Sequence, residues 1–514
     1  MKIKKIILVS LLAAGFLIRF LYLFHFQSTA FFNPVFLKGF DQRTFNVLAL
    51  EILKHPIHVD GQVFWIAPLY SYFLAFIYFL FGKNNFFAAG FIGIVIDVLT
   101  GFFIYLLGRK VAGEWTGLGA LFLYIFYRTI IVYSTTILSD GFILFLNLAF
   151  IVSLYYAIGK KPNYIFWVLS GVVLGLASLA KPTILAFLPF LFIGLFLYPE
   201  QNYLPEKKHL SLKNRNRFFQ PSMVFSIILI SAFLIILPVT LRNWYVAKTF
   251  VPIAREGWTD WKLGNSIDSP GFFYYPHGFL LSPLGLNFWL LFLKKIFLFF
   301  NTYEWPQDLN VYFMGKIIPV LKFAFVHFGF VVPFGVTGIF FMRNVRKNFL
   351  FYSFVFIQFL WVVLFFVVDR FRLPFVACLM IPAVFAGQII FLELKNKRLI
   401  KPFIIILIAG LIFFFSSIPL VTKRIPPVYY KIFYQISFKN ILYDIKTGNF
   451  KDAEEKAETL VRIIPYNPVT HFLLATVYFG EDKKEQAQKQ AEESLQIDPN
   501  YTIAKQFLKQ INKF

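Results

Sequence analysis

The sequence predicts an all-α fold: a polytopic transmembrane helix bundle of about 11 spans, with a small helical-repeat unit at its C-terminal end. Three observations lead to this prediction. The chain is 58% hydrophobic and only 15% charged, whereas soluble chains carry roughly 25% charged residues. Its apolar residues gather in many runs of about 20, which is long enough to cross a bilayer as helices. Past residue 433 the composition changes to Lys, Glu, Gln and Ala, and a sequence pattern repeats.

Eleven apolar runs have the length of membrane spans. They are residues 6–26, 86–108, 116–134, 139–159, 164–180, 182–198, 223–241, 318–342, 349–368, 375–393 and 401–420. The first run is longer than the apolar core of a secretory signal, and no small-residue cleavage site follows it, so we expect it to be retained as a helix. A twelfth run, 67–82, is shorter, and its length alone does not show whether it crosses the membrane.

The positions of basic residues decide the topology. If the N-terminus is inside and 67–82 lies along the outer surface as an interfacial helix, almost every basic connector falls on the inner side, as the positive-inside bias expects. These connectors hold Arg109–Lys110, Lys160–Lys161, the basic residues of 199–222, Arg343–Lys347 and Lys395–Arg398. The formal charge of +24 is therefore explained without nucleic acid. We expect a multi-pass protein of the plasma membrane, in contact with its lipids and with the C-terminal unit outside.

Two regions are predicted: a membrane domain over 1–425, with long outer loops at about 27–85 and 242–317, and helical repeats over 433–514. The repeats have a period of 34, and five residues recur at that spacing. Ala453, Ala457, Glu458, Ile463 and Pro465 recur as Ala487, Ala491, Glu492, Ile497 and Pro499. This pattern resembles the tetratricopeptide repeat (TPR). The unit is interpreted either as a platform for a protein partner or as a packing cap on the outer face.

An ordered set of short motifs runs along the membrane domain. The motifs are the loop acid Asp41, Phe64–Tyr72 (FWIAPLYSY), Leu80–Gly82, Leu176–Pro182 (LASLAKP), Arg242–Asn243, Phe250–Ile253, Gly257–Trp258, Leu263–Asn265 and Arg370–Pro374 (RFRLP). Their order and spacing over about residues 6–395 resemble the GT-C glycosyltransferases of the protein O-mannosyltransferase and aminoarabinose transferase clan.

The resemblance implies transfer of a sugar from a polyprenyl-phosphate donor, at the outer face, to a glycan, lipid or protein acceptor. The acid of the first outer loop in that family maps to Asp41, which would act as the general base. Many members carry a second acid beside it, whereas this chain has Gln42. Inversion at the sugar carbon is usual in such enzymes. The sequence predicts no cofactor and no set of metal ligands, although it does not exclude a bound divalent cation.

Four basic residues at outer ends of the predicted spans are candidates to bind the donor phosphate: Lys181, Arg242, Arg370 and Arg372. Arg370 and Arg372 are exceptions to the inside bias, and a local anion would explain them. The alternatives are a snorkelling role for Lys181 and interface anchoring for the arginines.

Three acids have competing interpretations. Asp140 begins a predicted span after Ser139 and either caps that helix or lines a substrate cavity. Asp41, at the start of a predicted outer helix, has the same capping alternative. Asp97 and Arg128 fall inside predicted spans, where charges are usually paired, so we expect them to form an ion pair with each other.

Two other functions are weighed. A non-enzymatic lipid or solute transporter would be expected to show internal repeats with broken helices at matching positions, and the two halves of this chain show no such symmetry. An envelope scaffold acting through its repeats would need far fewer spans. The sequence holds no Walker-type phosphate loop and no dinucleotide glycine fingerprint, which agrees with a lipid-activated donor.

Overall fold

The computed structural model describes residues 2–57, 59–158, 164–197, 219–342, 344, 346–421 and 425–511. Its described residues form α- and 3₁₀-helices, with a few isolated β-bridges and no named strand. The predicted all-α fold is confirmed. The basic loop 199–222, predicted to be inside, falls mostly outside the described residues, as do Lys160 and Lys161.

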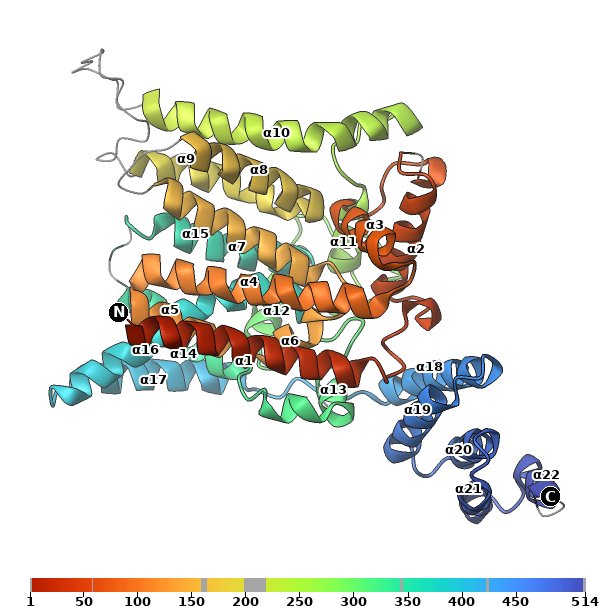
Figure 1. The fold of residues 1–514 in the computed structure, drawn as a ribbon. Coiled ribbons are helices and arrows are strands. Elements are labelled where there is room, and N and C mark those ends of the chain that lie inside the picture. The colour runs from red at the N-terminus through yellow and green to blue at the C-terminus, as the bar shows by residue number, and fades with distance from the viewer. Residues whose placement is uncertain are drawn as a thin grey trace.

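Apolar helices running in roughly one direction build the main body of the molecule (Figure 1). Within the described residues, five helices are long and apolar enough to cross a membrane. They are α1 (Lys2–Phe26), α4 (Phe86–Ala112), α7 (Asp140–Ala157), α10 (Phe219–Ala247) and α16 (Leu373–Lys395). Shorter apolar helices accompany them: α8 (Tyr164–Ala180), α9 (Leu188–Leu197), α14 (Phe328–Phe341), α15 (Phe349–Leu364) and α17 (Ile400–Ser416).

The predicted span 116–134 is two helices rather than one. Helix α5 (Glu114–Ile125) ends before Phe126, and the short α6 (Arg128–Ser134) follows. At the break, Arg128 N–H donates to the carbonyl of Val326, and Val326 N–H donates to the carbonyl of Phe126. This exchange with a distant segment replaces the helical hydrogen bonds that a continuous helix would make.

The predicted ion pair between Asp97 and Arg128 is wrong. Asp97 forms its ion pair with Arg19 of α1, and Tyr124 O–H donates to Asp97 Oδ1 at 2.6 Å. Arg19 also donates to the carbonyl of Ile125 at 3.2 Å. The break after α5 separates Arg128 from Tyr124 and Ile125, which do contact this pair.

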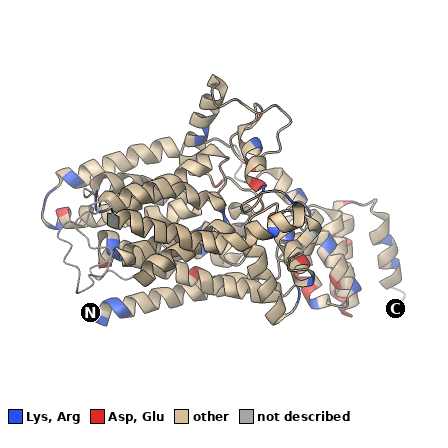
Figure 2. Ribbon diagram, turned by 90° about the horizontal axis from the view of Figure 1, so that it is seen from above, with Lys and Arg blue, Asp and Glu red and all other residues tan. Residues whose placement is uncertain are grey.

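Irregular segments and short helices gather at the end of the bundle opposite the N-terminus (Figure 1). There α2 (Asp41–Lys54), α3 (Leu69–Phe81) and α11 (Glu256–Asn265) lie close together, and α2 runs across the direction of the bundle helices. Charged residues are rare along the bundle and gather at its two ends and in the C-terminal helices (Figure 2).

The segment between α11 and α14 continues this irregular region. It holds α12 (Leu286–Phe300), α13 (Val311–Ile317) and a 3₁₀ turn over Pro319–Phe323. A second 3₁₀ turn, Arg370–Arg372, comes directly before α16. Residues 301–310, between α12 and α13, contribute to the site described below.

Five helices make the C-terminal unit: α18 (Pro427–Lys446), α19 (Phe450–Ile463), α20 (Pro468–Gly480), α21 (Lys484–Ile497) and α22 (Thr502–Ile511). Helices α19 and α21 begin and end 34 residues apart. Ala453, Ala457, Ala487 and Ala491 are fully buried, because small side chains let paired helices approach closely. Residue 433 lies within α18, which begins at Pro427, and the domain boundary stays a prediction. The membership of this unit in the TPR class stays a prediction.

Candidate functional site

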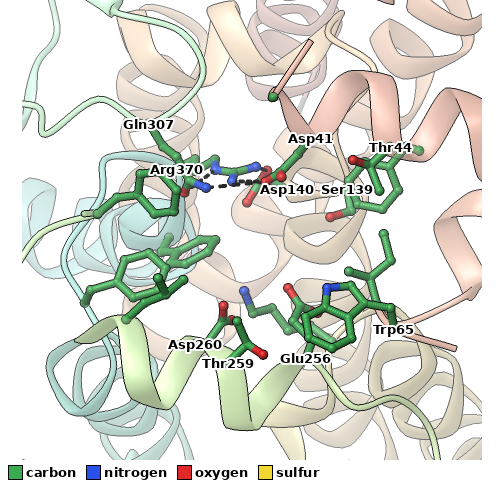
Figure 3. A pocket seen from close by; sticks show the side chains of 18 of the residues that line it. Asp41, Thr44, Trp65, Ser139, Asp140, Glu256, Thr259, Asp260, Gln307 and Arg370 are labelled. Atoms are coloured by element: carbon green, nitrogen blue, oxygen red, sulfur yellow. Dashed lines mark hydrogen bonds and ion pairs between the residues drawn. The ribbon is translucent and has the colours of Figure 1, made fainter. Parts of the chain in front are cut away.

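A cavity of about 350 Å³ opens between the irregular segments at the end of the bundle opposite the N-terminus. Its walls come from α2, residues 65–66, the start of α7, the end of α8, α11, segment 301–310 and the turn before α16. Its polar lining residues are Asp41, Thr44, Ser139, Asp140, Lys181, Glu256, Thr259, Asp260, Tyr275, Gln307 and Arg370. Segments far apart in the sequence thus bring acids and bases into one space (Figure 3).

Asp41 is the first residue of α2, and its carboxylate points toward Arg370 on the same wall of the cavity (Figure 3). The side chain is 43% exposed and forms an ion pair with Arg370 through Oδ2. Gln307 Nε2 donates to the same oxygen at 3.4 Å. The first turn of a helix also favours a negative charge. Asp41 therefore combines a favourable helix position with a side chain that is held in place and still reaches the cavity.

Arg370 is the centre of the charged network. Its guanidinium is buried and lies within 3.1 Å of Asp140 Oδ2 and 3.6 Å of Asp308 Oδ2, in addition to Asp41. Its Nε donates to Gln307 Oε1 at 3.3 Å. Burial raises the pKa of Asp308 to about 7, with a further rise from the charge of Asp41 and an opposing effect of Arg370. One cation thus holds three acids together.

Asp140 begins α7, where the N-cap residue Ser139 makes no side-chain capping bond. The Asp140 carboxylate accepts from Arg370 and lines the cavity.

Lys181 follows the last residue of α8 and reaches the cavity from a different wall. Its Nζ lies 3.6 Å from the ring centroid of Phe371 and 4.6 Å from that of Trp361. Among the described residues, no carboxylate oxygen lies within 4.0 Å of it. Aromatic faces attract a cation without neutralising it, so Lys181 presents a positive charge to the cavity.

Two cavity acids were missed by the sequence reasoning. Glu256 and Asp260 lie one turn apart on α11, on the wall opposite Asp41 and Arg370 (Figure 3). Burial raises the pKa of Glu256 to about 7; Lys181 opposes this rise, and Asp260 and Asp41 add to it. Burial also raises the pKa of Asp260. The signal was their spacing of four residues within 242–317, the second loop predicted to be outside, which places both on one helix face.

Arg242 lies outside this cavity. Its guanidinium donates to the backbone carbonyls of Ile57, Val59 and Gln62 at 2.6–2.8 Å and stacks on Phe64. Its neighbour Asn243 accepts from Phe64 N–H. Arg242 thus fixes the chain that leads to the cavity residue Trp65, and its expected phosphate contact stays a prediction.

Arg372 also lies outside the cavity and is almost fully buried. It donates to the carbonyls of Phe299, Asn301 and Tyr303 at 3.0 Å and to Glu304 Oε2 at 2.6 Å. Its donors hold segment 301–310 against the bundle. Sequence reasoning could not separate Arg370 from Arg372, because both flank Phe371 and their directions depend on the turn between them.

Residues 65–236 match the sequence model of a family described as dolichyl-phosphate-mannose-protein mannosyltransferase. The predicted family resemblance is confirmed over this segment. The matched segment includes the cavity residues Trp65, Asp140 and Lys181. Asp41, Glu256 and Arg370 lie beyond it. No curated protein sequence matches the chain.

Three solved structures of GT-C enzymes are similar to the chain. The oligosaccharyltransferase of Archaeoglobus fulgidus is 15% identical with a TM-score of 0.46, covering 82% of this chain and 54% of that one. ArnT from Cupriavidus metallidurans, bound to undecaprenyl phosphate, is 13% identical with a TM-score of 0.46, covering 94% and 79%. The S. cerevisiae Pmt1–Pmt2 complex is 16% identical with a TM-score of 0.38, covering 48% and 34%. The chain therefore spans about half the length of the archaeal enzyme.

Proposed function

We propose that this protein is a membrane glycosyltransferase that moves a sugar from a polyprenyl phosphate to an acceptor hydroxyl in the cavity lined by Asp41 and Lys181. The observation that carries the proposal is the placement of the held carboxylate of Asp41 and the ammonium group of Lys181 in one cavity. The family match over residues 65–236 supports the same reaction class. ArnT, one of the similar proteins, binds undecaprenyl phosphate.

Asp41 is the general base in this proposal. The described contacts of its carboxylate, from Arg370 and Gln307, both fall on Oδ2, so Oδ1 is the oxygen available to an acceptor. As the acceptor oxygen attacks the anomeric carbon, its proton passes to Asp41. The bond between that carbon and the phosphate oxygen breaks, and the phosphate leaves with the electron pair. The family resemblance implies inversion at the sugar carbon.

Lys181 stabilises the departing phosphate. Negative charge develops on the phosphate oxygens as the bond breaks, and a fixed cation at that place lowers the barrier. Arg370 holds Asp41, Asp140 and Asp308 and so orients the base. For Arg242 and Arg372 we propose structural roles, because their guanidinium groups bind backbone carbonyls and, for Arg372, Glu304.

The cavity end of the bundle faces outward in the proposed topology, with the N-terminus inside and the C-terminal helices outside. The basic connectors support this orientation, because Lys and Arg are enriched in loops on the inner side of a membrane and this topology places the connectors there. A nucleotide sugar is not expected on that side of the membrane, which agrees with a lipid-linked donor. The acceptor is a glycan, a lipid or a protein.

Release of sugar from the donor tests the proposal. The purified protein is given radiolabelled dolichyl-phosphate mannose or, in parallel, GDP-mannose, with membranes of the producing cell as the acceptor source. We expect mannose to leave the lipid donor only. Release from GDP-mannose alone would contradict the proposal. A carrier that merely moves the lipid would bind it and leave the sugar–phosphate bond intact.

A further inference from the structure

Helix α18, the first helix of the C-terminal unit, contacts both outer segments that build the cavity. Phe433 of α18 is buried between Phe31 of the first segment and Phe313 of the second, with ring centroids 5.9 and 5.1 Å away. Farther along α18, Tyr443 packs on Phe36 at 5.5 Å. The chain from Phe31 and Phe36 leads directly into α2 and Asp41. Helix α18 therefore packs against two segments that are far apart in the sequence.

Tyr429 lies one turn before Phe433 and connects α18 to the charged network. It is buried, and its O–H donates to the backbone carbonyl of Gln307 at 3.1 Å. The side chain of Gln307 bridges Asp41 and Arg370, because it donates to Asp41 Oδ2 and accepts from Arg370 Nε. A single residue thus has its backbone held by the C-terminal unit and its side chain placed on the proposed base.

Segment 301–310 has further described anchors on either side of Gln307, including the ion pair of Asp308 with Arg370 and the bond from Tyr133 O–H to the carbonyl of Leu309 at 3.4 Å. Arg372 binds the carbonyls of Asn301 and Tyr303, and Asp369 N–H donates to the carbonyl of Trp305 at 2.8 Å. After Gln307, the side chain of Asn310 caps α13. At Gln307 itself, the backbone contact comes from Tyr429 of the C-terminal unit.

We propose that Tyr429 is a positioning residue and that the C-terminal unit completes the active site by holding Gln307 against Asp41 and Arg370. The catalytic part of this inference rests on the proposed function, whereas the mechanical part does not. It gives the C-terminal helices a direct role in transfer: a partner that binds or displaces α18 would change the orientation of the base.

Tyr429→Phe tests the proposal in the full-length protein, since it removes one hydroxyl and keeps the buried ring. Tyr434→Phe is the matched control, because Tyr434 lies on the same helix and makes a ring contact with Phe438 of that helix. Hydrogen–deuterium exchange of peptides covering 301–318 gives a readout that needs no substrate. Glu304 N–H and Phe313 N–H, which donate to Tyr312 Oη and Asn310 Oδ1, report on the segment.

Tyr429→Phe should raise exchange in 301–318 roughly two- to tenfold, the scale of one lost hydrogen bond, with α16 unchanged. Mannose release from dolichyl-phosphate mannose should fall in kcat by a similar factor, with the donor KM unchanged. Tyr434→Phe should match the wild type in both. Unchanged exchange in Tyr429→Phe would overturn the proposal whatever the activity shows. If Tyr429→Phe exchanges faster but the wild type releases no mannose, the result would support the contact of Tyr429 with Gln307 and contradict dolichyl-phosphate mannose as the donor.

Discussion

Arg370 Nη1 donates to Asp140 Oδ2 at 3.1 Å, although 230 residues separate the two in the sequence. The contact joins the start of α7 to the turn before α16, and the same guanidinium pairs with Asp41 and Asp308. A buried arginine with several carboxylate partners stays charged and fixed in direction. The carboxylate of the proposed base is thereby tied to the turn before α16 and, through Arg370, to the start of α7.

Replacing Lys181 should weaken donor binding. Lys181→Gln removes the cation that we propose for the leaving phosphate, and hydrogen bonds to charged groups contribute roughly 1.5–3 kcal/mol. The donor KM should therefore rise about ten- to a hundredfold in steady-state mannose release, and kcat should also fall, because the same cation stabilises the charge that develops on the leaving phosphate. Lys262→Gln is the control, because Lys262 lies on α11 but does not line the cavity. Equal KM values for Lys181→Gln and the wild type would remove Lys181 from the phosphate site.

Glu256 should make stability depend on pH. Its pKa is raised from the ordinary 4.5 to about 7, chiefly by burial. The unfolded chain loses this proton near pH 4.5 and the folded chain near pH 7, so raising the pH through that window lowers the free energy of unfolding. Glu256→Gln should abolish this part of the dependence. The difference between its apparent Tm and that of the wild type should therefore increase as the pH rises from 4.5 to 7.

The measurement is a thermal melt of both proteins in detergent from pH 4 to pH 9. Glu455→Gln serves as the control, since Glu455 is exposed on α19. A Tm difference between Glu256→Gln and the wild type that stays constant across the whole range would show that Glu256 titrates in the same way folded and unfolded.

Arg372 should affect stability rather than donor affinity. Arg372→Ala removes the cation that pairs with Glu304 and one donor from each of three carbonyls, and breaking a buried ion pair costs roughly 3–5 kcal/mol. We expect a clearly lower apparent Tm and an unchanged donor KM in the protein that remains folded. Replacing both partners, as in Arg372→Met with Glu304→Leu, should restore part of the stability. A raised KM with an unchanged Tm would instead favour phosphate binding.

Composition and run length were enough to predict the helical bundle, because the spacing of apolar runs follows from bilayer thickness. The break at Phe126–Tyr127 could not be predicted in this way, since it depends on backbone bonds with Val326, 200 residues away. The wrong partner for Asp97 follows from the same break.

The candidate site was predicted in part, and the division has a physical reason. Asp140, Lys181 and Arg370 stand at ends of apolar runs, where an unusual charge is visible in the sequence, and Asp41 stands at the start of a predicted outer helix; all four line the cavity. Arg242 and Arg372 carry the same signal but bind backbone carbonyls, which a sequence does not reveal. Gln307 and Asp308 were missed because their role exists only through the contact with Arg370.

Mannose release by Asp41→Asn, compared with Asp452→Asn, tests the central claim most directly. Asn is nearly isosteric with Asp, so the fold should persist, and Asp452 is an exposed acid of α19 far from the cavity lining. A positioned general base contributes roughly 100- to 10,000-fold. We predict that Asp41→Asn lowers kcat by that factor with the donor KM nearly unchanged, while Asp452→Asn matches the wild type. Transfer by Asp41→Asn at the wild-type rate would contradict the account and make Asp140 the next candidate for the base.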